Sequence, residues 1–127
     1  MRTPLLVSHF ANDADTGWRL AATVPEGETW ELDFALLSNQ SAGTIATYYL
    51  ALLAPRPDSQ NFSAGDVDTE GAIIWGGSTL ATMSEAEKTW GSTSAPRPLP
   101  CPPGSALWLK VSTADDVVLL LAGTRVS

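Results

Sequence analysis

Residues 28–38 have the sequence Glu-Thr-Trp-Glu-Leu-Asp-Phe-Ala-Leu-Leu-Ser, in which large apolar residues recur at every second position. This two-residue period is typical of a half-buried β-strand, because successive side chains of a strand point to opposite faces of the sheet. The buried face is therefore expected to carry Trp30, Leu32, Phe34 and Leu36, and the solvated face Glu31 and Asp33.

The chain on both sides of this strand repeats the pattern, interrupted by turn residues. We predict further strands at residues 18–24, 44–54, 73–75, 105–113 and 117–122. Residues 55–71 are expected to form a long polar loop, and residues 123–127 a short tail. Residues 80–90 fit either a strand or turn or a short helix. Short strands at this spacing predict an all-β fold, either an antiparallel β-sandwich or a jelly roll.

The length of the chain fits one domain. A chain of 127 residues buries roughly two-thirds of the surface that it exposes when unfolded, so it can fold without a disulfide or a metal. We expect a single β-sandwich domain at residues 17–127. Residues 1–16 hold a short apolar run followed by polar residues, and they are expected to form an extended N-terminal arm.

The charge balance of the chain is strongly acidic. Lys and Arg total 7 and Asp and Glu total 14, which gives a net charge of −7. Phosphate backbones and anionic membrane surfaces repel such a chain, so we expect neither nucleic acid nor a membrane among its partners. The N-terminal apolar run is shorter than a secretory signal, and no stretch is as long as a membrane-spanning helix. The chain is therefore expected to be made in a cytoplasm and to leave it only as part of an assembly.

Residue types that carry catalysis are sparse in this sequence. His9 is the single histidine and lies in the expected arm, and Cys101 lies among prolines and is expected to be a small apolar residue. No G-x-S-x-G elbow, phosphate-binding loop or dinucleotide fingerprint is present, so we expect neither an enzyme nor a cofactor. Asp66, Asp68 and Glu70 alternate like the first ligands of a calcium loop. The twelfth position of that loop is occupied by a glycine, so these residues are only weak metal-ligand candidates.

Five tryptophans are present, and their positions leave two functions open. Trp30 is expected in the core. Trp108 alternates with two leucines and is expected on the other, exposed face of its strand. Exposed aromatic side chains stack on sugars or anchor protein interfaces. A carbohydrate-binding module with Trp75, Trp90 or Trp108 as its sugar platform is therefore the alternative from another functional class.

Two of the predicted strands, residues 44–54 and 117–122, are apolar on both faces, whereas an antiparallel sandwich normally leaves one face polar. Either the loop at residues 55–71 or another subunit must cover the second face. The arm can likewise add to the sheet edge of a neighbour or lie against its own domain. The interface candidates are Leu5, Val7, Phe10, Tyr48, Trp108, Val118 and Leu120.

The layout of the chain resembles a known family. Residues 24–30 (Val-Pro-Glu-Gly-Glu-Thr-Trp) open a strand, residues 36–44 (Leu-Leu-Ser-Asn-Gln-Ser-Ala-Gly-Thr) lead into another, and residues 103–112 (Pro-Gly-Ser-Ala-Leu-Trp-Leu-Lys-Val-Ser) precede a final hairpin. Over residues 20–125 this layout is similar to that of the small β-sandwich virion proteins of tailed bacteriophages. No single residue in it is diagnostic.

The resemblance implies a non-enzymatic virion protein, often trimeric, bound to the surface of a shell or tail, so a homo-oligomer, with a trimer favoured, is expected. A capsid decoration protein that contacts the major capsid protein is the expected role. An accessory protein of the head or the tail is the nearest alternative. Mass action would then stabilise the shell without any chemistry.

Overall fold

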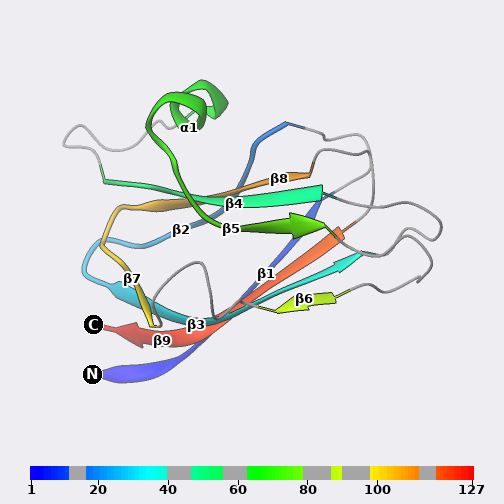
Figure 1. Ribbon diagram of the computed structural model, residues 1–127. Helices are drawn as coiled ribbons and strands as arrows, with labels where there is room; N and C mark the ends of the chain where they lie inside the picture. The colour runs from blue at the N-terminus through cyan, green and yellow to red at the C-terminus, as the bar shows by residue number, and fades with distance from the viewer. Residues whose placement is uncertain (12–16, 40–46, 56–62, 79–86, 90–97, 112–116) are drawn as a thin grey trace.

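The computed structural model describes residues 1–11, 17–39, 47–55, 63–78, 87–89, 98–111 and 117–127. These residues form strands and one short helix, drawn in Figure 1. The elements are β1 (Arg2–Ala11), β2 (Arg19–Thr23), β3 (Thr29–Asn39), β4 (Thr47–Leu53), α1 (Ala64–Glu70), β5 (Ala72–Ser78), β6 (Glu87–Thr89), β7 (Leu99–Cys101), β8 (Ala106–Val111) and β9 (Val117–Val126).

The strands pack as two antiparallel sheets, one above the other in Figure 1. The first sheet has the order β1-β9-β3-β6, and the short strand β7 also pairs with β3. The second sheet has the order β2-β8-β4-β5. In chain order the strands change from one sheet to the other after β1, β2, β3, β5, β7 and β8, and this winding is that of a jelly roll. The predicted all-β sandwich is confirmed.

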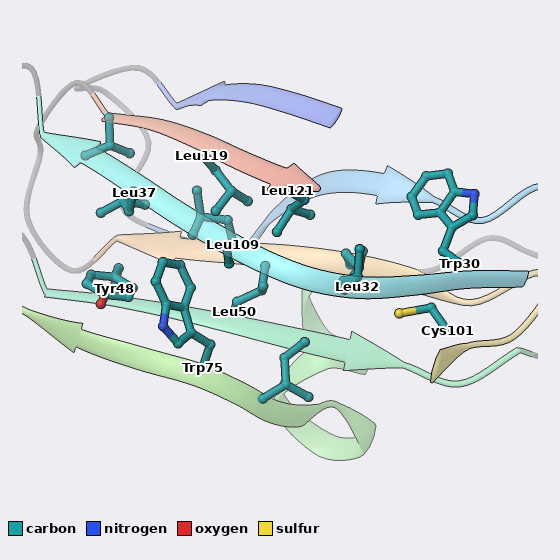
Figure 2. Close-up of a cluster of buried hydrophobic side chains, with 14 of the residues drawn as sticks. Trp30, Leu32, Leu37, Tyr48, Leu50, Trp75, Cys101, Leu109, Leu119 and Leu121 are labelled. Carbon is teal, nitrogen blue, oxygen red and sulfur yellow. The ribbon is translucent and has the colours of Figure 1, made fainter. Parts of the chain in front are cut away.

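The core lies between the two sheets. Its side chains come from alternate positions of the strands, and Figure 2 shows them meeting from both layers. Tyr48 and Trp75 pack against each other with ring centroids 4.7 Å apart, and Trp30 and Cys101 lie near one another in the core. The fully or nearly fully buried members include Leu32, Leu37, Tyr48, Leu50, Leu107, Leu109, Leu119 and Leu121.

Strand β3 changes which face it buries part-way along its length. Its pairing with β9 shifts by one residue between Leu32 and Phe34. Before this bulge Trp30 and Leu32 point inward, and after it Ala35 and Leu37 do. The expectation that Phe34 and Leu36 share the buried face was therefore wrong, because one extra residue reverses the alternation.

Both ends of the chain are strands of the first sheet. Residues 2–11, part of the expected extended arm, form β1 and pair along their whole length with β9 of the same chain, so of the two alternatives left open the arm lies against its own domain. The expected tail at residues 123–127 is wrong, since β9 continues to Val126. Backbone hydrogen bonds join Met1 and Ser127 in both directions, at 2.8 and 3.0 Å, and the two termini lie side by side in Figure 1.

Helix α1 replaces part of the expected loop at residues 55–71, of which residues 56–62 lie outside the described residues. Ser63 begins the helix with a capping box: its side chain accepts from the Asp66 backbone N–H, and the Asp66 carboxylate accepts from the Ser63 N–H. Val67 is the buried residue of the helix. It packs on the outer surface of the second sheet, together with Ala51, Leu53, Ala106 and Trp108.

Candidate functional site

The outer surface of the first sheet carries a group of apolar side chains that do not take part in the core. We call this group the open face and define it as Leu6, Phe10, Phe34, Leu36, Val118, Leu120 and Ala122. Leu6 is 69% exposed and Phe10 is 56% exposed, and the other five are half-buried. Within the described part of the chain, nothing comparable to α1 packs over them.

The strand register places these residues in three adjacent rows. Across β1, β9 and β3, the first row is Leu6, Ala122 and Phe34. The second row is Ser8, Leu120 and Leu36, and the third is Phe10, Val118 and Ser38. Paired residues of neighbouring strands point to the same side of a sheet, so the three rows form one continuous surface.

No charged side chain lies in these three rows. The nearest charge on the same surface is Asp33, the extra residue of the bulge, which is exposed beside Phe34. The register also pairs Glu87 of β6 with Ser38 of the third row. At the end of the sheet that holds the termini, Arg2 and Glu31 form an exposed ion pair. An exposed pair of this kind contributes little to stability. The open face is therefore an uncharged apolar surface on a chain whose net charge is −7.

The bulge in β3 is what completes the open face. If β3 kept one phase, Phe34 and Leu36 would point into the core with Trp30 and Leu32. The one-residue shift turns them outward beside Leu120 and Ala122 of β9. The open-face residues that were missed as interface candidates are Leu6, Phe34, Leu36 and Ala122. A signal for Leu6 was available, because Leu6 and Phe10 share one face of a strand and Leu5 and Val7 share the other.

The predicted interface candidates divide between the two surfaces of the sheets. Phe10, Val118 and Leu120 lie on the open face, as an interface would require. Leu5, Tyr48 and Trp108 are buried inside the chain, and Val7 is half-buried against the core, so none of these four lies on the open face. Their strands present the opposite side chains outward.

Two of the three tryptophans expected to form a sugar platform are not available for one. Trp75 is buried in the core, and Trp108 is only 6% exposed because α1 and Trp18 cover it. Trp90 lies outside the described residues. Trp18 is half-buried; its indole N–H donates to Asp68 at 2.9 Å, and Lys110 Nζ lies 5.8 Å from its ring centroid. The expectation of an exposed Trp108 is thus wrong.

The acidic residues of the candidate calcium loop lie on α1 instead of a loop. Asp66 caps the helix through Ser63, and Asp68 accepts the hydrogen bond from Trp18. Glu70 is exposed at the last position of the helix. Among the described residues, no three His, Cys, Asp or Glu side chains are arranged to hold a metal ion. The carboxylates of Asp66 and Asp68 therefore have structural roles.

The titratable groups in and near the core favour their neutral forms. Burial raises the pKa of the Cys101 thiol to about 12, and it also raises the pKa of Tyr48 to about 12. Burial lowers the pKa of His9, whose Nε2 is buried without a hydrogen-bond partner. A thiol that stays protonated is a poor nucleophile, so Cys101 acts as a core residue.

Comparisons with known proteins add no assignment. No protein-family model matches the chain, and no curated protein matches it either. In the described part of the chain, no helix has the length and apolar character needed to cross a membrane. The fold and the open face are therefore the observations on which a function can be argued.

Proposed function

We propose that this chain is a non-enzymatic structural protein that binds a partner surface through the open face. Following its resemblance to the small β-sandwich virion proteins of tailed bacteriophages, we take the partner to be the major capsid protein. The chain would then be a capsid decoration protein located in the virion. The single observation that carries the proposal is the uncharged apolar open face on an otherwise acidic chain.

The fold by itself does not choose between the two functions left open by the sequence. Jelly rolls occur in viral capsid proteins and in lectins alike. A lectin-like site needs exposed aromatic rings beside polar groups that orient a sugar. The three rows that hold the open face instead combine Leu, Val, Ala and Phe side chains with two serines, and Trp75 and Trp108 are buried. These observations favour a protein partner over a glycan.

The two most exposed members of the open face set the scale of binding. Fully burying a Leu or Phe side chain contributes about 1.5–3 kcal/mol. Because Leu6 is 69% and Phe10 is 56% exposed, the two together contribute roughly 2–4 kcal/mol when a partner covers them. The half-buried members contribute to the fit of the surface and add little further apolar area that a partner could bury. Binding of many copies to a repeating shell would multiply this modest gain.

The direct test uses empty shells assembled from the major capsid protein that is encoded with this chain. The purified protein should sediment with the shells, and at saturation it should raise their melting temperature. Absence of both effects at saturating protein would overturn the proposal. Sedimentation with tails and not with shells would replace the decoration role with that of a tail accessory protein.

A matched pair of variants locates the binding surface. Phe10 on β1 and Ile73 on β5 are both on edge strands and are 56% and 57% exposed. Phe10→Asp places a carboxylate on the open face and should weaken shell binding by about tenfold or more. Ile73→Asp makes the same kind of change on the other sheet and should leave binding unchanged. Equal losses in both variants would show that the open face is not the contact.

A further inference from the structure

The free edge of β1 has a hydrogen-bonding pattern that can be derived from its pairing with β9. Met1 and Ser127 exchange two backbone hydrogen bonds, so they form a hydrogen-bonded pair of the antiparallel ladder. Pairs of this kind alternate along a ladder, and the β1–β9 register runs from residue 2 to residue 11 without a shift. The odd residues of β1 therefore bond to β9, and the even residues direct their N–H and C=O groups to the free edge.

Pro4 agrees with this assignment. It is an even residue, so its missing N–H falls on the free edge, which is where proline is tolerated in a sheet. Beyond it, Leu6, Ser8 and Phe10 present an uninterrupted series of outward donors and acceptors. Since β1 ends the sheet order, no described strand pairs with this edge.

We propose that the partner of this edge is β1 of a second copy of the chain, paired antiparallel about a two-fold axis at Ser8. In this register Leu6 of one copy lies opposite Phe10 of the other on both sides of a central Ser8–Ser8 pair. Every outward N–H and C=O of these three residues then has a partner. In registers centred nearer the N-terminus, Pro4 lies opposite a carbonyl of the other copy. Because proline has no N–H to donate, such registers lose hydrogen bonds.

The side chains at this edge also fit a second copy. The pairing brings together Leu6 and Phe10, the two most exposed side chains of the open face. Apolar cross-strand pairs of this kind stabilise antiparallel sheets. The chain has a net charge of −7, so two copies repel each other in general, but residues 5–10 carry no carboxylate or ammonium group. Two copies can thus approach at this edge without opposing like charges.

The dimer would have a defined size and shape. The two first sheets become one continuous sheet, and the two open faces lie on the same side of it. A single pair of strands buries less than the roughly 1,200 Å² of total area that marks the lower limit of stable complexes. The dimer is therefore expected to dissociate on dilution. It does not depend on the proposed capsid partner, because it forms from this chain alone.

Sedimentation equilibrium over a wide range of protein concentration tests the proposal. The mass should rise from 13.4 kDa toward twice that value. Ser8→Pro removes the central donor of both copies and no bond to β9, so it should raise the dissociation constant roughly tenfold or more. Ser8→Ala keeps the donor and should dimerise like the unsubstituted chain. A dimer that Ser8→Pro leaves intact would overturn the edge pairing, and a trimer would overturn the two-fold axis.

Amide hydrogen exchange gives a readout on the unsubstituted chain, so it does not depend on whether a proline variant folds. The N–H groups of Leu6, Ser8 and Phe10 should exchange fast in dilute solution and more slowly as the concentration rises. The N–H groups of Leu5, Val7 and His9 bond to β9 and should be protected at every concentration. Unchanged exchange at the three even residues, in a sample that remains 13.4 kDa, would refute the proposal.

Discussion

Replacing Gly123 by alanine tests the bulge that creates the open face. Gly123 lies in β9 opposite Leu32, at the point where the pairing with β3 shifts. A Cβ atom added there would overlap the backbone carbonyl oxygen of Glu31 and crowd the Cα of Leu32. Both obstacles are backbone atoms of a central strand pair, so no side-chain rotation can relieve the contact.

The expected cost follows from what must move. Overpacking of a tightly packed site costs about 1–3 kcal/mol. Separating β3 from β9 at the bulge also weakens one or two backbone hydrogen bonds, each worth about 1 kcal/mol. The free energy of unfolding should therefore fall by roughly 2–5 kcal/mol, from a total of about 5–15 kcal/mol for a domain. The melting temperature should fall by about 10–20 °C.

Thermal and urea unfolding followed by circular dichroism measure both quantities. Gly17→Ala is the matched control, since no atom lies within 4 Å of the position of an added Cβ at Gly17. That substitution should be neutral or stabilise by about 0.4–1 kcal/mol, because alanine restricts the unfolded chain. If Gly123→Ala costs less than about 1 kcal/mol, or behaves like Gly17→Ala, the close approach of β3 and β9 at the bulge is refuted.

Two further predictions concern titration. Burial lowers the pKa of His9 below its ordinary 6.5, so just below that pH the unfolded chain binds more protons than the folded chain. The melting temperature should therefore fall as the pH drops through about 6.5. His9→Gln should reduce this dependence of the melting temperature on pH. The same dependence of melting temperature on pH in the variant and the unsubstituted chain would contradict this prediction. Burial raises the pKa of Cys101 to about 12, so a thiol reagent at pH 8 should react slowly with the folded protein and rapidly with the protein in urea; equal rates would show that the thiol is open to solvent.

The fold was predictable because most strands repeat a two-residue period between clear turn residues. The alternation around Trp30 and Leu32 correctly identified a half-buried strand at the centre of the first sheet. What the period could not show was the bulge after Leu32, since an extra residue in one strand depends on its partner. The same holds for β9 beyond Gly123, where glycine and polar residues look like a tail until β1 and β3 pair with them.

The candidate site was only partly predictable for a related reason. The apolar outer face of residues 44–54 correctly indicated that something covers the second sheet, and α1 covers part of it. For residues 117–122 the need for a covering partner stays a prediction. The helix was missed because Val67 is its single buried residue, although Ser63 and Asp66 have the spacing of a capping pair. Without the helix, Trp108 looked like an exposed ring, and the sugar-binding alternative followed from it.

The position of β9 has a consequence for how the protein is made. This strand follows every other described strand, yet it lies between β1 and β3, and among the described strands it alone links them in the sheet order. During synthesis both edges of β1 therefore stay unpaired until β9, more than a hundred residues later in the chain, has left the ribosome. Contacts so distant in sequence form slowly, and unpaired strand edges attract other chains in the meantime. The first sheet can close only when the synthesis of β9 is complete, so truncating β9 should yield aggregates rather than a smaller folded domain.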